Sequence, residues 1–336
     1  MRQPSRQLPT FAKLLLLVGS AVVALALVEV ALRFTGRFPI PPARVTTERP
    51  EMYEAYPPYG YRLRPSRTMT YSYPRQNPRQ LTVHANRHGF RGARELDEAD
   101  SRTRILVVGD SFVFGEGVEE SERFTDRIEA AEPGWRVDNL GMTGFGPDLM
   151  LRAFQAVGLG LKPDVVVLAI YTDDFRRVRP EYAGAGFEIP RFAIRSGALA
   201  SIDYPRETVW SRWSSVVALR RALWSASGLE WTLNEKILDR FRADAAAANC
   251  ALLIAFLPAE NDLPPDVERR RWLREYAART STPFRDLTEA VLDPRERPLF
   301  IPGNWHLNPA GHAVVARELV TELKTITSTA LQRQAR

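Results

Sequence analysis

The sequence changes from apolar to polar within Arg104-Ile105-Leu106-Val107-Val108-Gly109-Asp110-Ser111, residues 104–111. A short continuous apolar run that ends at a glycine is typical of a strand buried on both faces of a parallel sheet. Ser111 therefore follows the carboxyl end of a predicted strand, the edge at which open α/β sheets bind their ligands. Taken alone, this motif is more typical of a turn with a capping serine than of a nucleophile.

Four further apolar runs follow and alternate with helical stretches. The predicted strands are Arg104–Val108, Arg136–Leu140, Asp164–Tyr171, Ala251–Leu257 and Pro283–Leu287. The predicted helices are Phe124–Ala131, Pro147–Gly158, Leu233–Ala248, Pro265–Ala278 and a last one from Pro309 to about Leu323. This alternation predicts a three-layer α/β/α domain on a parallel sheet, which we assign to residues 92–336.

One interval, from about Asp174 to Thr232, shows no strong strand pattern. It contains a concentration of tryptophans, namely Trp210, Trp213, Trp224 and Trp231. We interpret residues 175–232 as a helical insertion that overhangs the carboxyl edge of the sheet. Local packing of these four bulky side chains is an equally weighted alternative.

An N-terminal apolar segment runs from Leu14 to Leu32, interrupted by Gly19, Ser20 and Glu29. About 20 such residues span a bilayer as a helix. We therefore predict a tail at residues 1–13 and a single-pass membrane anchor at residues 14–34. A cleaved signal peptide is the alternative, although its apolar region usually covers only about 7–15 residues.

Basic residues flank the anchor on both sides, so charge counting does not fix its orientation. We favour the topology with the N-terminus inside, which places the main domain in the periplasm or outside the cell. Residues 35–91 are rich in Pro and Tyr and predict an irregular, β-containing segment near the membrane. For its tyrosines, packing against the main domain is favoured over binding of a carbohydrate or headgroup.

Composition narrows the possible partners. The net charge is +6, but the 46 basic and 40 acidic residues are scattered along the chain, so we expect no nucleic-acid partner. The single cysteine, Cys250, lies at the entrance of a predicted strand and is expected in the core. No Cys/His cluster has metal-ligand spacing, and we expect neither a metal nor a cofactor.

Two loops complete the candidate site. Asn139-Leu140-Gly141-Met142-Thr143-Gly144 follows the second predicted strand, and its glycines allow backbone N–H groups to approach a developing oxyanion. Read alone, this loop is a simple strand-to-helix turn. Gly303-Asn304-Trp305-His306-Leu307-Asn308-Pro309 precedes the last predicted helix, so His306 lies on a loop, while Pro309 suits the first helical turn.

In their joint order these motifs resemble the SGNH hydrolase superfamily of GDSL-like lipases and esterases. The resemblance is closest to bacterial members with an N-terminal anchor. It extends to Glu29 and Arg33 at the end of the apolar segment, to Asn86-Arg87-His88-Gly89-Phe90-Arg91 before the first strand, and to His306-Leu307-Asn308-Pro309-Ala310-Gly311-His312. It implies a flavodoxin-like fold.

The resemblance also implies roles for residues. Ser111 would attack an ester carbonyl and His306 would take its proton. The oxyanion hole would comprise the N–H groups of Ser111 and Gly144, together with a side chain at position 173. The same resemblance makes Asp110, Gly141 and Asp174 supporting residues.

Two positions depart from the family pattern. Asp173 stands where relatives carry an amide donor, and losing one such donor costs about 100- to 1000-fold in rate. Asn304 stands where anchored relatives carry the triad aspartate, so it can orient the imidazole but supplies no charge. Asp286 and Asp293 are alternative carboxylates for that role.

We therefore expect a membrane-anchored serine esterase or deacylase that acts on an acylated small molecule or glycan outside the cytoplasm. One alternative is a catalytically weakened or inactive relative that binds acylated polymers in the envelope. The other alternative is an acyltransferase that uses Ser111.

Overall fold

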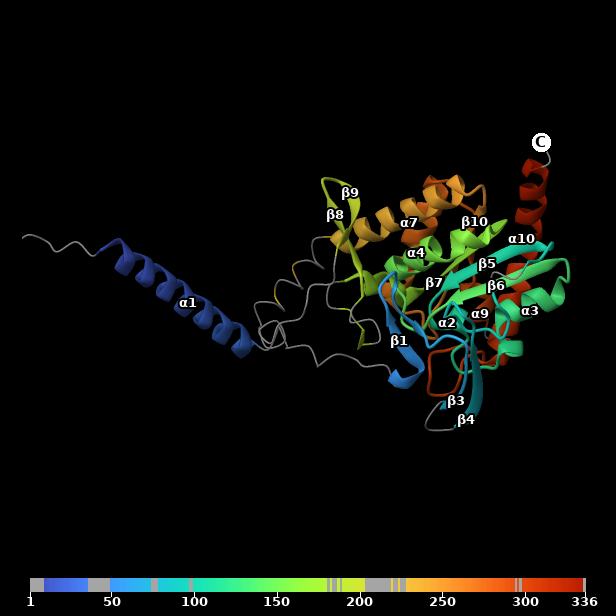
Figure 1. The fold of residues 1–336 in the computed structure, drawn as a ribbon, viewed down its shortest axis with the longest axis horizontal. Helices are drawn as coiled ribbons and strands as arrows, with labels where there is room; N and C mark the ends of the chain where they lie inside the picture. Colours follow the sequence, from blue (N-terminus) through green and yellow to red (C-terminus); the bar gives the residue numbers. More distant parts are fainter. Residues whose placement is uncertain are drawn as a thin grey trace, which may run out of the picture. The chain divides into compact units, whose positions relative to one another are not determined.

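A parallel five-stranded sheet forms the centre of the fold, as the sequence predicts. The computed structural model describes residues 9–35, 49–73, 78–96, 99–179, 182, 186–187, 189–202, 219, 223, 228–293, 295 and 298–334. The sheet has the strand order β11-β10-β7-β5-β6 (Figure 1). Its strands are β5 (Thr103–Gly109), β6 (Trp135–Gly141), β7 (Val165–Tyr171), β10 (Ala251–Leu257) and β11 (Phe284–Asp286).

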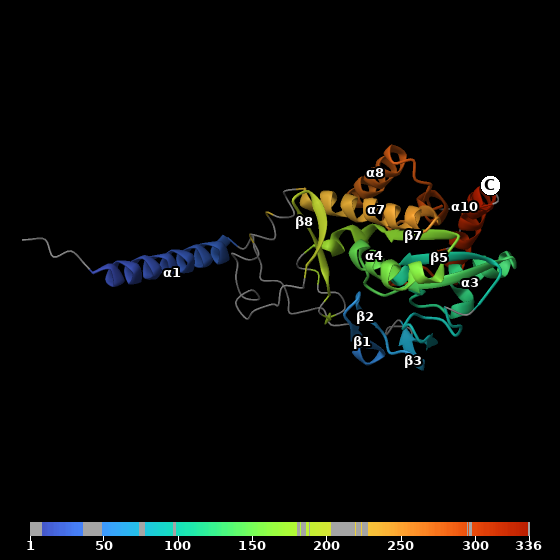
Figure 2. The ribbon, with the colours of Figure 1, turned by 45° about the horizontal axis from the view of Figure 1, so that its top comes forward.

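Helices cover both faces of this sheet, which confirms the three-layer α/β/α architecture (Figures 1 and 2). One face packs on α3 (Phe124–Ala131) and α10 (Pro309–Gln334) through a buried cluster that includes Ile105, Val107, Ile128, Val315 and Leu319. On the other face, α4 (Pro147–Ala156) packs against α7 (Leu229–Ala247), where the Phe154 and Phe241 rings stack with centroids 4.5 Å apart. Helix α8 (Pro264–Arg279) follows β10.

The segment before the sheet forms two antiparallel hairpins. The first joins β1 (Tyr53–Tyr56) to β2 (Gly60–Leu63), and the second joins β3 (Arg67–Tyr73) to β4 (Arg79–Ala85). Tyr53, Tyr59, Tyr61, Tyr71 and Tyr73 are all buried. The Tyr59 and Tyr61 rings lie 5.9 Å and 5.4 Å from the ring of Phe145, in the loop after β6. These tyrosines therefore pack against the sheet domain.

In the described part of residues 175–232, the structure contains a β-hairpin that the sequence does not predict. This part contains the 3-10 helix η4 (Thr172–Val178) and the antiparallel strands β8 (Arg191–Arg195) and β9 (Ala198–Ile202). Both turn residues, Ser196 and Gly197, have positive φ, which produces the twist that a tight two-residue hairpin needs. Trp210, Trp213 and Trp224 lie outside the described residues, whereas Trp231 packs on Phe175 and Trp272.

The N-terminal helix α1 spans Thr10–Thr35, slightly more than the predicted anchor. Within Thr10–Phe34 an 18-residue window has a mean hydropathy of 2.6 and none of it is buried, so the helix is long and apolar enough to cross a membrane. A signal sequence has the same properties. Near its end, the Arg33 Nε donates to Glu29 Oε1 at 2.9 Å, which pairs the two charges that interrupt the apolar surface.

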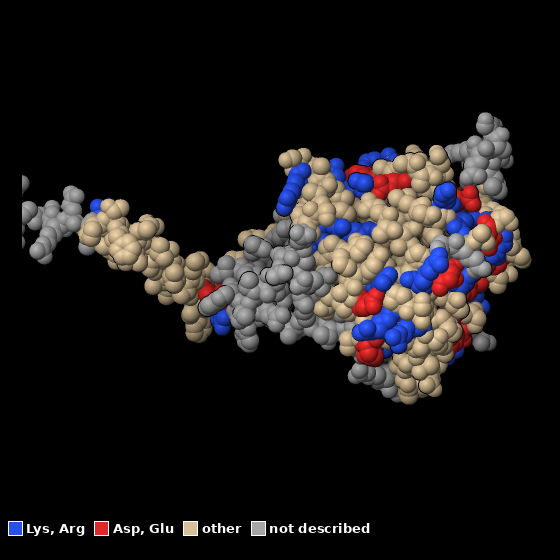
Figure 3. Space-filling model, viewed as in Figure 1, with Lys and Arg blue, Asp and Glu red and all other residues tan. Residues whose placement is uncertain are grey.

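Charge is distributed evenly over the face of the molecule that Figure 3 shows. Blue basic and red acidic side chains lie next to one another there rather than in separate patches. Many basic and acidic side chains of the described structure are paired, such as Arg94 with Glu129 and Arg102 with Asp100. This face therefore carries no extended field of one sign.

Candidate active site

Ser111 is the first residue of α2 (Ser111–Phe114), directly after β5. Asp110 caps this short helix, because its Oδ1 accepts the Phe112 N–H at 2.9 Å. Gly141 allows β6 to approach α2, since a Cβ there would overlap the backbone of Val113 and Phe114. The Asn139 amide donates to the Val113 carbonyl at 2.6 Å. Asp110 and Gly141 thus hold the serine at the carboxyl edge of the sheet.

His306 reaches this serine from a loop 195 residues further along the chain. Its Nε2 lies 2.8 Å from Ser111 Oγ, and both residues are buried. The loop is closed by a bond from the Ile301 N–H to the His306 carbonyl at 2.9 Å. Asn308 ties the loop to α10, because its Oδ1 accepts the N–H groups of Ala310 and Gly311. The structure therefore brings together the predicted nucleophile and base.

Asn304 determines how the imidazole is protonated. Its Oδ1 lies 2.7 Å from His306 Nδ1 and also accepts the His306 backbone N–H at 3.0 Å. The backbone bond orients the amide with its oxygen toward the ring, and that oxygen can only accept a hydrogen bond. The contact thus favours the tautomer with a proton on Nδ1, which leaves the Nε2 lone pair free to receive the serine proton.

A second oxygen contacts the same ring nitrogen. The Tyr73 Oη, from the end of β3, lies 2.7 Å from His306 Nδ1. The sequence does not predict this contact. The alternation along Tyr71-Ser72-Tyr73 indicates that the Tyr73 side chain faces inward, but it does not indicate which residue Tyr73 contacts. Asp286 and Asp293, the alternative carboxylates, instead pair with Arg274 and Arg295.

Burial makes His306 a weak base. Desolvation lowers the pKa of His306 to about 4. Glu116 and Asp110 act in the opposite direction and raise the pKa, whereas Arg177 and Arg49 lower it. The imidazole is therefore neutral at pH 7, which is the form that accepts a proton.

A buried ion-pair cluster lies beneath the serine. Arg177 Nη1 lies 2.9 Å from Asp110 Oδ2 and 2.6 Å from Asp174 Oδ1, and it donates to the Phe145 carbonyl at 2.7 Å. Burial, followed by the charge of Asp110, raises the pKa of Asp174 well above its usual value. Burial lowers the pKa of Arg177, but the two carboxylates outweigh it and raise that pKa overall. The sequence singles out both aspartates but not the arginine between them.

The loop after β6 is fixed by tyrosine hydroxyls. Tyr61 Oη donates to the Thr143 carbonyl at 2.6 Å, and Tyr182 Oη donates to the Gly144 carbonyl at 2.8 Å. Gly144 has a φ of +85°, and a Cβ there would lie 2.9 Å from Tyr61 Oη. A glycine is therefore needed at this position.

Asp173 is half-buried, and its carboxylate forms an ion pair with Arg176 one turn further along η4. Its charge is thus partly neutralised by a partner on its own element. The neighbouring Asp174 is fully buried and pairs with Arg177.

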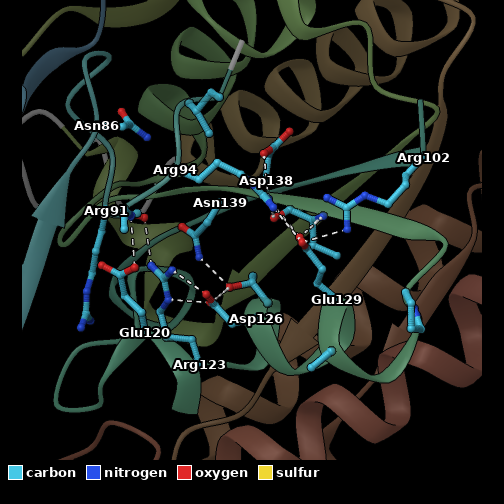
Figure 4. A pocket seen from close by; sticks show the side chains of 17 residues that line it. Asn86, Arg91, Arg94, Arg102, Glu120, Arg123, Asp126, Glu129, Asp138 and Asn139 are labelled. Carbon is cyan, nitrogen blue, oxygen red and sulfur yellow. Dashed lines mark hydrogen bonds and ion pairs between the residues drawn. The ribbon is translucent and has the colours of Figure 1, made fainter. Parts of the chain in front are cut away.

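A separate polar cavity of about 550 Å³ lies between α3, β6 and the Asn86–Leu96 segment (Figure 4). Its charged lining comprises four basic and four acidic side chains, namely Arg91, Arg94, Arg102, Arg123, Glu120, Asp126, Glu129 and Asp138. Arg94 holds Glu129 through two bonds of 2.7 Å and 2.9 Å, and Arg123 Nε donates to Asp126 at 2.9 Å. The opposite charges balance, and Arg94 fastens the Asn86–Leu96 segment to α3 through Glu129 and to β6 through the Val137 carbonyl at 3.2 Å.

The chain is similar to known proteins in sequence family and in fold. Residues 107–314 match the family model described as GDSL-like Lipase/Acylhydrolase family. The chain matches no curated protein in sequence.

Solved structures with a related fold include TesA, with 18% identity over 66% of this chain and 99% of that chain and a TM-score of 0.46. A lipolytic G-D-S-L protein from Desulfitobacterium hafniense has 14% identity, covers 66% of this chain and 99% of its own, and has a TM-score of 0.43. Esterase EstA from Pseudoalteromonas sp. has 12% identity, covers 66% and 97%, and has a TM-score of 0.44. Because the family model matches residues 107–314, more than half of the chain, and includes both Ser111 and His306, the chain belongs to the GDSL-like lipase/acylhydrolase family.

Proposed function

We propose that this chain is a membrane-anchored serine esterase or deacylase in which Ser111 is the nucleophile and His306 the general base. The observation that carries the proposal is the 2.8 Å contact from Ser111 Oγ to His306 Nε2, with Asn304 Oδ1 on the opposite ring nitrogen. A nucleophile bonded to a base that is itself oriented by a third group is the arrangement that activates serine.

The reaction follows from this geometry. Ser111 Oγ attacks the ester carbonyl carbon as its proton moves to His306 Nε2, and the carbonyl oxygen becomes an oxyanion. The imidazolium then protonates the leaving alcohol, and an acyl-serine remains. Water attacks the acyl-serine and gives a proton to His306. The imidazolium then protonates Ser111 Oγ as the carboxylic acid leaves, which restores both residues.

We propose the backbone N–H groups of Ser111 and Gly144 as hydrogen-bond donors to the oxyanion. The loop that contains Gly144 is fixed by Tyr61 and Tyr182, which bond to its carbonyls. Asp173 supplies a negative charge in place of a third donor, and its pairing with Arg176 limits the repulsion. The rate therefore falls below that of a family member with an amide at this position.

The position of Trp305 favours a substrate with a bulky or ring-shaped group. Its side chain is 59% exposed, and its ring lies 5.6 Å from that of His306. Exposed tryptophan beside a reactive group offers a flat surface for an acyl chain or a sugar ring. We propose O-acyl groups on an extracytoplasmic glycan as the substrate, with α1 as the anchor and the N-terminus on the cytoplasmic side.

Loss of the nucleophile tests this function. The full chain, purified in detergent, should hydrolyse p-nitrophenyl acetate, and Ser111→Ala should lower kcat/KM at least about 1000-fold. Ser101→Ala, at an exposed position, serves as the control and should leave the rate unchanged. Hydrolysis that is absent, or equal in Ser111→Ala and the parent, would contradict the esterase and favour the polymer-binding alternative.

The pH dependence should report the same base. Because the pKa of His306 lies near 4 and only its neutral form accepts a proton, kcat/KM should stay level from neutral pH down to about 5. It should then fall about tenfold per pH unit below about 4. Initial rates with the same ester measure this fall of kcat/KM at acid pH, and circular dichroism corrects the rates for unfolding. A midpoint near the usual imidazole value would mean that His306 is not buried as the structure has it.

A further inference from the structure

Tyr73 lies on β3, which precedes the family-matched residues, and its ring packs against His306. The tyrosine is 7% exposed, and its ring meets the imidazole edge-on, with centroids 6.1 Å apart and planes at 66°. A Cβ on Gly117 would lie only 2.7 Å from the Tyr73 ring, so the Gly117 turn packs directly on it. The ring is therefore fixed on two sides.

The hairpin that carries Tyr73 is itself clamped to the nucleophile's loop. Arg91 is buried and donates to the Thr82 carbonyl of β4, at 3.1 Å, and to the Gly115 and Val118 carbonyls after α2, at 2.6 Å and 2.8 Å. Glu119 Oε1 accepts the Thr82 N–H at 3.1 Å. Since β3 pairs with β4 along its whole length, these bonds set the position of Tyr73 relative to Ser111.

We propose that Tyr73 is a positioning residue for His306 which, together with Asn304, takes the place of the missing carboxylate of the triad. This inference rests on the proposed function. In the reactive tautomer the single Nδ1 proton lies between two acceptor oxygens, each 2.7 Å away. When Nε2 receives the serine proton, both bonds stabilise the imidazolium, because hydrogen bonds to charged groups are the stronger ones.

The charge that the two neutral oxygens lack comes from further away. Glu116 and Asp110 raise the pKa of His306, whereas Arg177 and Arg49 oppose them. Glu116 is 2% exposed, pairs with Arg49 and accepts the Thr143 hydroxyl at 2.9 Å. The guanidinium of Arg49 also stacks over the Tyr71 ring at 3.9 Å. Tyr73 therefore supplies a hydrogen bond to the base, and the favourable charge comes from Glu116 and Asp110.

Tyr73→Phe tests the hydroxyl alone, because the ring and its packing remain. In the full chain, kcat should fall about 10- to 100-fold with KM unchanged, the size of a lost hydrogen bond to a charged group. Tyr71→Phe is the matched control, since the neighbouring Tyr71 hydroxyl is buried with no hydrogen-bond partner. Tyr71→Phe should keep the parent kcat. Equal kcat in both variants would overturn the proposal.

A second measurement separates this proposal from the proposed function. In ¹⁵N-histidine-labelled protein carrying Ser111→Ala, the Nδ1 nitrogen and proton resonances of His306 should move on Tyr73→Phe and stay in place on Tyr71→Phe. Resonances that do not move would overturn the role of Tyr73. If these resonances move but the parent chain shows no Ser111-dependent hydrolysis, the contact between Tyr73 and His306 is upheld and the esterase is contradicted.

Discussion

Asn304→Asp should raise kcat at least about tenfold, because it returns a negative charge to the position that faces the imidazolium. In the parent chain Asn304 Oδ1 already lies 2.7 Å from His306 Nδ1 and accepts the His306 N–H. An aspartate keeps both contacts, since its oxygens are acceptors only. It also stabilises protonated His306, so the pKa of the imidazole should rise and the acid limb of kcat/KM should move to higher pH.

Steady-state hydrolysis of p-nitrophenyl acetate between pH 4 and 8 measures both effects. Asn261→Asp is the matched control, because it makes the same change at an exposed asparagine in the loop after β10. Asn261→Asp should keep the kcat of the parent chain and the acid limb of its kcat/KM profile. An Asn304→Asp protein that folds normally, yet turns over no faster than the parent, would contradict the role assigned to this position.

Arg177→Met should lower the free energy of unfolding by about 3–5 kcal/mol, since it leaves buried carboxylates without their cation. Asp110 and Asp174 are fully buried, and Arg177 contacts both of them as well as the Phe145 carbonyl. Methionine retains much of the side-chain volume but none of the charge. Because Asp110 also caps α2, the loss should disturb the position of Ser111.

Urea denaturation of the detergent-purified chain measures this loss. Arg176→Met is the control: the adjacent arginine is 55% exposed and pairs with Asp173 one turn away. An exposed ion pair is worth about 0–1 kcal/mol, so the control should stay close to the parent. If the two variants lose the same stability, the buried cluster does not hold the nucleophile's turn as described.

The sequence predicts the central sheet closely because its signals are local. The boundaries of β6, β7 and β10 match the predicted strands to within a residue, since long apolar runs have few other ways to be buried. The position of Ser111 is predicted because residues that follow parallel strands collect at one edge of the sheet, whereas the role of His306 is predicted from the family resemblance. Strands β8 and β9 are missed. Their one local signal is Ser196-Gly197 between short alternating stretches.

The polar contacts within the site depend on tertiary structure and leave little trace in the sequence. Tyr73 and His306 lie 233 positions apart, and Arg177 lies 67 positions from Asp110. Neither pair has a spacing that a periodic pattern reports. Asp173 and Asn304 are identified as departures because a family pattern defines what to expect there. Their partners are seen only in the folded chain. Asp173 pairs with Arg176, and Asn304 accepts from the backbone N–H and Nδ1 of His306.

In the proposed reaction, Ser111 is a nucleophile activated by His306. Incubation of the full chain with a fluorophosphonate probe, followed by peptide mass spectrometry, tests it directly. We expect one adduct per chain on Ser111, no adduct in Ser111→Ala, and labelling slowed at least about 1000-fold in His306→Asn. Labelling elsewhere, or labelling of Ser111 at the parent rate without the imidazole, would contradict the claim.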